Sequence, residues 1–459
     1  MSETQNKALH YAHERQQIFL ENLKALVSIP SISTTPAYDG DVYKAAEWLA
    51  AYFNQLKFDQ IKIFPTNKHP IVYAEMLGAG DDAPTVLIYG HYDVQPAEPL
   101  DKWDSPAFAP AVRGDNLYAR GTTDMKGQVM ASIYAIEAII KSGELPINVK
   151  FIIEGEEEIG SPNLAAFIRN NKDLLASDFA LNPDTGMLAQ DLPTVTYGLR
   201  GLAYFELSLW GPSQDLHSGV FGGVIHNPAQ VLTELIAGLH DKQGQVSLPG
   251  FYNSVRPLED DERAELARLP IGDDFFIQNS GASVLWDGEE GFTSVERTGA
   301  RPTLEVNGLI SGFTGEGAKT VIPAFAMAKI SCRLVPDQDP KEVQKQFEDF
   351  LEHNAPKTVR WNLELLSGAP ASISDRNSRW VQAYMRAAEN VWGVKPLFKR
   401  EGGSVPVVND FQEILGVESV NIGFALPEDN MHGPNEKLHL PTWHKGIDTL
   451  IHFFFNLVS

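Results

Sequence analysis

The fold is decided by the stretch Phe151-Ile152-Ile153-Glu154-Gly155-Glu156-Glu157-Glu158-Ile159-Gly160-Ser161. Its apolar, β-branched first part predicts a buried strand, which runs directly into four carboxylates and a glycine. Carboxylates crowded at a buried position are tolerated only when they are protonated, paired with a base or bound to metal, because desolvation and mutual repulsion oppose their charge. The nearest base, Lys150, lies at the other end of the strand. The stretch therefore indicates a cation site beyond a buried strand.

Two further loops carry the same kind of chemistry. Gly90-His91-Tyr92-Asp93 follows a short apolar run, and Gly121-Thr122-Thr123-Asp124-Met125-Lys126-Gly127 precedes a long apolar segment. Strands that alternate with helices predict an α/β sheet, and such sheets bind ligands beyond the carboxyl ends of their strands. We therefore expect the three loops to form one metal site at one rim of the sheet.

Hydrophobic periodicity predicts the elements of this first domain. We expect helices at about 13–29, 42–56 and 125–141, and strands at 61–64, 71–76, 84–89 and 148–153. Residues 103–117 are expected to be a loop. From about residue 372 the α/β pattern resumes and continues to a closing helix.

The pattern differs between these two parts of the chain. Strands are expected at 202–210, 303–308, 325–335 and 359–366, with helices beginning at Pro228 and Pro340. This βαββαβ order is that of the ferredoxin-like split unit. We therefore predict a discontinuous catalytic domain, residues 1–198 and 370–459, and an inserted domain, residues 199–369. Within the latter, residues 242–300 are expected to be an irregular insertion of unassigned role.

Composition excludes several classes of protein. The 459 residues allow two or three domains, and the formal net charge of -23 argues against a nucleic-acid partner, which requires clustered Lys and Arg. No apolar run has transmembrane length and residues 1–17 lack a signal-peptide pattern, so we expect no membrane partner and a cytoplasmic location. The single cysteine, Cys332, rules out an intrachain disulfide and is expected to be a core residue.

The candidate ligands are imidazoles and carboxylates, without thiolate. They are His91, Asp93, Asp124, Glu157, Glu158, Asp184 and His432. This donor set favours Zn, Mn or Co. Three ligand carboxylates and a bridging hydroxide would carry four negative charges, which two divalent cations would neutralise.

Each candidate also has a purely structural interpretation. Taken alone, His91 could be a core residue, Asp124 a helix N-cap and Asp184 a turn residue. The acidic stretch around Glu157 could be a solvated turn, although the buried strand before it counts against that. What favours metal is that all the candidates fall where one rim of one sheet would gather them.

Longer motifs carry a resemblance to a known family. Gly90-His91-Tyr92-Asp93-Val94-Gln95-Pro96, Tyr118-Ala119-Arg120-Gly121-Thr122-Thr123-Asp124-Met125-Lys126-Gly127 and the acidic stretch from Glu154 resemble the zinc aminoacylase/carboxypeptidase G2-type metallopeptidase family. Asp215-Leu216-His217-Ser218-Gly219, Cys332-Arg333-Leu334-Val335-Pro336 and Glu401-Gly402-Gly403-Ser404-Val405-Pro406 are similar to its carnosine dipeptidase and cytosolic nonspecific dipeptidase branch. The resemblance covers nearly the whole chain.

The resemblance implies a mixed-sheet zinc-peptidase domain with an inserted ferredoxin-like α+β lid and dimerisation domain. It also implies a role for each motif residue. Asp124 would bridge two zinc or manganese ions, one completed by His91 and Asp184 and the other by Glu158 and His432. Asp93 would orient His91, and Glu157 would be the general base. The residues alone do not decide which of the adjacent glutamates is the base.

The same resemblance implies the substrate contacts. Arg333 would bind the terminal carboxylate of the substrate, and His217 would stabilise the oxyanion from the other subunit of a homodimer formed through the lid. Glu401, Gly403 and Ser404 would line the substrate pocket. Arg333 could instead pair within the lid, and Ser404 could be a turn residue.

These expectations describe a two-metal dipeptidase for short peptides with a free carboxyl terminus. An alternative with the same site is an N-acyl-amino-acid deacylase or desuccinylase, which would not require a free α-amine. A non-catalytic calcium module is a third possibility, but it would cluster oxygen ligands in one loop and use no histidine.

Overall fold

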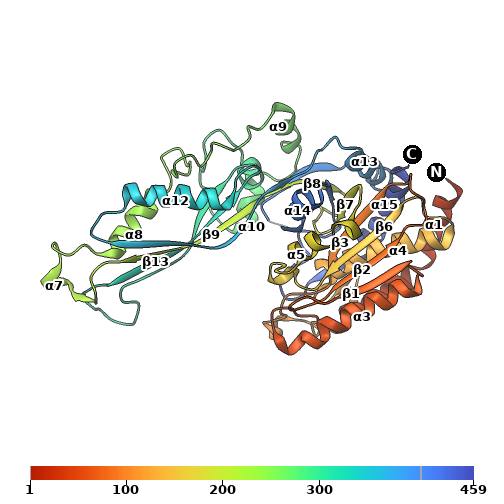
Figure 1. Cartoon of the computed structure of the whole chain (residues 1–459), viewed down its shortest axis with the longest axis horizontal. Coiled ribbons are helices and arrows are strands. Elements are labelled where there is room, and N and C mark those ends of the chain that lie inside the picture. The colour runs from red at the N-terminus through yellow and green to blue at the C-terminus, as the bar shows by residue number, and fades with distance from the viewer. Residues whose placement is uncertain (1, 404–405, 459) are drawn as a thin grey trace. The chain divides into compact units, whose positions relative to one another are not determined.

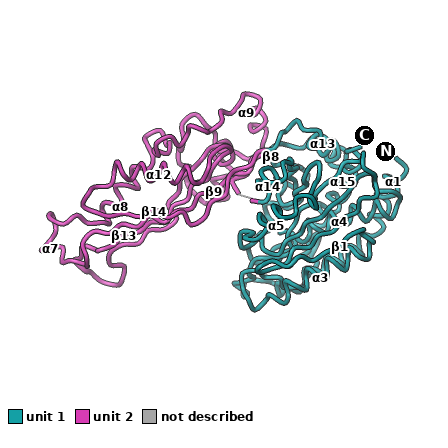
Figure 2. Tube along the Cα trace, viewed as in Figure 1, with its two compact units in different colours: residues 1–197, 374–399, 407–459 teal, residues 198–373, 400–406 magenta. Residues whose placement is uncertain are grey.

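The computed structural model describes residues 2–403 and 406–458. The chain divides into two compact units, one of residues 1–197, 374–399 and 407–459 and the other of residues 198–373 and 400–406 (Figure 2). Among the described residues, no helix is both long enough and apolar enough to cross a bilayer.

Unit 1 is built on a mixed sheet, as the α/β prediction requires. Within the described residues its order is β1-β2-β6-β3-β7-β17-β8-β15, with β16 paired to β8. The strands are β1 Gln60–Phe64, β2 Ile71–Met76, β3 Thr85–His91, β6 Asn148–Glu154, β7 Phe179–Asn182, β8 Thr194–Leu199, β15 Ser372–Ile373, β16 Leu397–Glu401 and β17 Ser419–Asn421; by residue range β15 and the last residues of β8 and β16 belong to unit 2.

The centre of this sheet is parallel, and that direction positions the site. β3 lies between β6 and β7 and runs parallel to both, with His91 opposite Glu154 in the register. Every residue of β6 is buried. Because parallel strands end at the same edge, the residues that follow β3, β6 and β7 meet at one rim.

Helices surround the sheet (Figure 1). α3 packs against β1 and β2, whereas α4 packs against β3 and contacts α1 and α15. α4 is buried from Gly127 to Ile139, which explains why its sequence is apolar on all sides. The helices of unit 1 are α1 Glu3–Glu14, α2 Gln16–Val27, α3 Asp39–Gln55, α4 Gly127–Ser142, α5 Leu164–Asn170, α6 Lys172–Leu175, α13 Arg379–Trp392, α14 Pro406–Asp410 and α15 Leu440–Asn456.

A small antiparallel sheet of unit 1 connects distant segments of the chain. Its order is β18-β5-β4, formed by Lys437–His439, Asn116–Tyr118 and Ala111–Arg113. Lys437 lies opposite Tyr118 in the register. The end of the loop before β18 therefore lies beside the start of the loop after β5. Both loops contain candidate ligands.

Unit 2 has the βαββαβ order expected from the sequence. Its elements are β9 Gly201–Trp210, α8 Pro228–Ala237, β11 Thr303–Ser311, β13 Phe325–Leu334, α12 Pro340–Asn354 and β14 Arg360–Ala369. The antiparallel sheet has the order β11-β13-β9-β14, and α8 and α12 pack against it. Alternate residues of β13 are buried, including Cys332, which is a core residue as expected. A short β10–α7 segment, Leu216–His217 and Ser218–Phe221, precedes α8, and β10 pairs with β12, Val321–Ile322.

The structure corrects four expectations. The predicted helix at 13–29 is two helices that meet at Arg15, and the predicted loop at 103–117 contains β4 and the start of β5. The insertion at 242–300 is not wholly irregular, because it forms α9 Asp260–Leu266, α10 Asp273–Ser280 and α11 Ser294–Gly299. Residues 400–406 group with unit 2 rather than with unit 1, since Arg400 pairs with Glu262 and the Glu401 carbonyl accepts from the backbone of Arg200.

Candidate metal centre

His91 and Asp93 form the first part of the centre, at the end of β3. Both are buried, and the Nδ1 atom of His91 lies 3.1 Å from the carbonyl oxygen of Asp93 and 3.5 Å from its carboxylate. The carboxylate of Asp93 also accepts from the backbone N–H groups of Glu157 and Glu158, at 3.2 and 3.0 Å. Asp93 therefore fixes one imidazole and the loop that carries both glutamates.

Asp124 lies between two histidines. Its carboxylate oxygens are 3.1 Å from Nε2 of His91 and 2.8 Å from Nε2 of His432. The turn that delivers it begins at Gly121, which has φ 82°, and a Cβ atom there would lie 2.6 Å from a methyl group of Val94. A glycine is required at this position both by conformation and by space.

The candidate ligands form two groups that share one carboxylate. His91, Asp124 and Asp184 make one group, and Asp124, Glu158 and His432 make the other. Within each group the ligand atoms lie within 4.8 Å of one another. Imidazole and carboxylate donors suit Zn²⁺ or Mn²⁺, and a shared carboxylate is the arrangement that a pair of ions requires. The donor set therefore fits two divalent metal ions.

The ligand groups concentrate negative charge in a largely buried place, and this changes their pKa values. Burial and the neighbouring Asp124 raise the pKa of Glu158 to about 8. The hydrogen bond with Asp124 raises the pKa of His432 to about 9. For His91, burial opposes the charged form, but hydrogen bonds with Asp124 and Asp93 raise its pKa well above the ordinary value. All three shifts have the same cause, because clustered buried carboxylates favour a positive charge close to them.

One prediction follows from these pKa values. A metal ion needs a deprotonated Glu158 and a neutral His432, and both groups hold a proton at pH 7 because their pKa values are about 8 and about 9. Metal binding at pH 7 should therefore release protons, and affinity should increase as the pH rises. Calorimetric titration in two buffers of different ionisation enthalpy measures this release. Equal heats in both buffers would contradict it.

Glu157 adjoins the ligands. Burial raises its pKa, and the positive charge of His91 opposes that shift. Gln95, which the sequence analysis did not single out, donates to Glu158 at 2.7 Å. Its only sequence signal was its position within the motif that contains His91.

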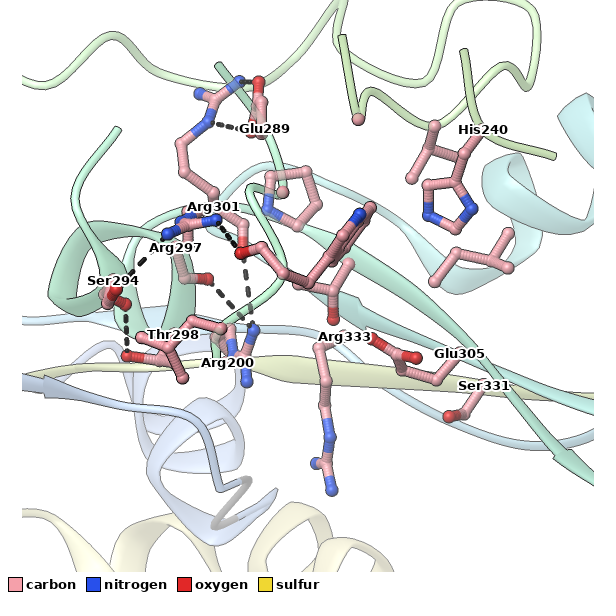
Figure 3. A pocket seen from close by; sticks show the side chains of 18 of the residues that line it. Arg200, His240, Glu289, Ser294, Arg297, Thr298, Arg301, Glu305, Ser331 and Arg333 are labelled. Atoms are coloured by element: carbon pink, nitrogen blue, oxygen red, sulfur yellow. Dashed lines mark hydrogen bonds and ion pairs between the residues drawn. The ribbon is translucent and has the colours of Figure 1, made fainter. Parts of the chain in front are cut away.

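The candidate substrate residues belong to unit 2. Arg333 lies on β13, opposite Leu202 of β9 and Thr303 of β11. It lines a cavity of about 500 Å³ whose other walls come largely from the 242–300 insertion. Figure 3 shows the guanidinium of Arg200 joined to the carbonyl oxygens of Arg297 and Arg301, with Arg333 nearby. Burial and the charge of Arg333 lower the pKa of Arg200 to about 10, whereas the charge of Glu305, which also lines the cavity, opposes that shift.

The other unit 2 candidates are more exposed. His217 ends β10 with an exposed side chain, whose Nδ1 atom accepts from the backbone N–H of Gly219 at 3.0 Å. Glu401 ends β16, and Gly403 is exposed with open space around its Cα. Ser404 lies outside the described residues. The structure thus brings together the five expected ligands and the neighbouring Asp93 in unit 1, and it places His217, Arg333, Glu401 and Gly403 in unit 2.

The chain is similar to known proteins over most of its length. Residues 87–456 match the model of peptidase family M20/M25/M40. A Cys-Gly metallodipeptidase of Candida albicans is 33% identical over 95% of this chain and 94% of its own length. A Beta-Ala-His dipeptidase of Mus musculus is 31% identical over 98% of this chain and 95% of its own. The crystal structure of an M20 family metallo-carboxypeptidase from Sulfolobus solfataricus is similar with a TM-score of 0.83, at 31% identity, over 96% of this chain and 99% of that one.

Proposed function

Because this chain belongs to peptidase family M20/M25/M40, which confirms the resemblance found in its sequence, we propose that it is a two-metal dipeptidase. Family membership makes it a hydrolase. The observation that carries the proposal is the pair of ligand groups that share Asp124, with Glu157 beside them. Relatives of this length whose names specify dipeptides support a short peptide as the substrate.

In the proposed mechanism the residues of unit 1 hold the metal ions, transfer the proton and orient a ligand. His91 and Asp184 would hold one divalent ion, Glu158 and His432 the other, and Asp124 both; zinc is the first choice and manganese or cobalt the alternatives. Two such ions would supply Lewis acidity, which lowers the pKa of a bound water and polarises a carbonyl group. Glu157 takes the proton of the water and delivers it to the leaving amine, and burial poises it for this by raising its pKa. Asp93 keeps His91 oriented.

Residues of unit 2 would recognise the substrate. Arg333 lines the cavity and would pair with the terminal carboxylate, because a planar guanidinium can form two hydrogen bonds with a carboxylate. His217 donates to the oxyanion, and Glu401, Gly403 and Ser404 line the substrate pocket.

We also propose that the protein is a homodimer. An edge strand of unit 2 supports an interface there, because an unpaired strand edge with exposed apolar side chains can pair with another chain. β11 is an edge strand whose Leu309 and Ile310 are 57% and 54% exposed, and Val224, after α7, is 82% exposed. The cytoplasmic location stays a prediction.

The test of function is a comparison of substrates. Dipeptides, the same dipeptides with an acylated amine, and matching N-acyl amino acids should be supplied to metal-loaded protein. Dipeptide hydrolysis that requires the free amine supports the proposal. Turnover of the N-acyl compounds alone would assign a deacylase instead.

A second prediction concerns the contact of Arg333 with the terminal carboxylate of the substrate. Amidation of a good dipeptide substrate removes the charge that the guanidinium pairs with, and such a charged hydrogen bond contributes about 1.5 to 3 kcal/mol. We expect kcat/KM to fall roughly ten- to a hundredfold for the amide, by that same free energy. Arg333→Lys should reduce the difference between acid and amide. Equal turnover of both by the wild-type protein would contradict the assignment.

A further inference from the structure

A buried ion pair joins the loops that carry the candidate ligands. Arg120 and Glu436 are 1% and 0% exposed, and Nη1 of Arg120 donates to the Glu436 carboxylate at 2.8 Å. The pairing of β5 with β18 explains how they meet, because Arg120 follows β5 and Glu436 precedes β18 in adjacent antiparallel strands. No part of the proposed mechanism uses either residue.

Glu436 binds the backbone of the loop that ends in Asp124. Its carboxylate accepts from the N–H groups of Gly121, Thr123 and Asp124, at 2.9, 3.0 and 3.2 Å. With the contact from Arg120, each carboxylate oxygen accepts two hydrogen bonds. The backbone of Asp124 is thus held in place by a carboxylate more than 300 residues away in the sequence.

With its other arm Arg120 binds the loop of Glu436 a second time and also one further loop. Nη2 donates to the carbonyl oxygens of His432 and Pro96, at 3.0 and 3.1 Å. Pro96 lies in the loop that follows His91, the last residue of β3. A third contact supports the same junction, because the hydroxyl of Thr123 donates to the carboxylate of Asp429 at 3.0 Å.

We infer that Arg120 and Glu436 are positioning residues that set the spacing of Asp124 and His432 and so determine the affinity of the metal site formed by Asp124, Glu158 and His432. This inference rests on the proposed function. The pair contacts the backbone of two of the three ligands of that site, but of the other site it contacts only the shared Asp124. Its loss should therefore weaken the two metal sites unequally.

The test is metal affinity in Glu436→Gln. The amide places an NH₂ group against N–H donors that the carboxylate accepts from, so the loop can no longer be held as before. Residues that orient metal ligands affect affinity by roughly ten- to a hundredfold, and we expect a loss of this size for one of the two ions. Competition with a chromophoric chelator measures both affinities, and metal content after dialysis counts the ions retained.

A matched control separates positioning from general destabilisation. Arg301 and Glu289 also form a buried pair, with contacts of 2.8 and 2.6 Å, but they lie in unit 2 without a candidate ligand. Glu289→Gln removes the same charge and should leave both metal affinities unchanged. Excess metal should restore kcat in Glu436→Gln with KM unaltered, because the substrate contacts are intact.

The outcomes are distinct. A selective loss in Glu436→Gln supports the inference, whereas equal affinities in wild type and Glu436→Gln, or equal losses in both variants, overturn it. If Glu436→Gln does not fold, Arg120→Lys provides the same test, since one ammonium keeps the charge but cannot span Glu436, Pro96 and His432. A wild-type protein that binds no metal would overturn the proposed function, and the inference with it.

Discussion

Glu157→Gln should bind metal like the wild type and lose roughly a hundred- to ten-thousand-fold in kcat, the usual contribution of a positioned general base. Glutamine fills the same space but cannot accept the proton of the attacking water. Because Glu157 is not in either ligand group, its charge is not needed to hold the ions. Metal content and steady-state rates, measured on the same preparation, test both parts of the prediction.

Glu158→Gln is the matched comparison. The two residues are adjacent, and the backbone N–H groups of both donate to the carboxylate of Asp93. Only Glu158 belongs to a ligand group. Glu158→Gln should lose affinity for one ion, and its activity should recover in part when metal is added in excess. An exchange of the two phenotypes would reverse the assignment of base and ligand.

His217→Ala should be nearly inactive as a homodimer, and a hybrid dimer should reveal which site His217 serves. An oxyanion donor lowers the activation barrier by about 2.7 to 4 kcal/mol, so its removal should decrease kcat roughly a hundred- to a thousandfold. A His217→Ala subunit keeps its own Glu157, and a Glu157→Gln subunit keeps its own His217. If His217 acts on the neighbouring subunit, the hybrid contains one intact site.

Co-expression with two different tags provides that hybrid. We expect it to recover up to about half of the wild-type activity per dimer, since one of the two sites of a symmetric dimer is restored. Hybrids as inactive as both parents would show that His217 acts within its own subunit. A monomer of wild-type activity would remove the dimer from the mechanism.

The elements that the sequence predicted well are those with strong periodicity or a buried apolar run. β6, α4 and β13 are examples, because every residue of β6 is buried, α4 is apolar on all sides and β13 alternates strictly. The helix boundary at Arg15 was missed because no proline or glycine separates the end of α1 from the start of α2. The short strands β4 and β5 have too few residues for alternation to be visible.

The candidate site divides along similar lines. His91 and Asp124 were predictable because each follows or precedes a recognisable buried element, whereas Glu158 was distinguished from Glu157 only by the family resemblance, and the ligand groups contain all three of His91, Asp124 and Glu158. The role of Glu436 could not be predicted, because its carboxylate accepts hydrogen bonds from backbone N–H groups more than 300 residues away in the sequence. Almost every residue has such a group whatever its side chain, so the sequence does not mark the partners. The shape of the cavity beside Arg333 depends on loops of the 242–300 insertion that have no periodic pattern.

The central claim is that two metal ions on a shared Asp124 support dipeptide hydrolysis. The most direct measurement is a titration of metal-free protein with Zn²⁺ or Mn²⁺, in which bound metal and dipeptide turnover are followed in the same samples. The account predicts saturation near two ions per chain, with full activity reached only as the second ion binds, since charge neutrality requires both. Full activity at one ion per chain, with no further binding, would contradict it.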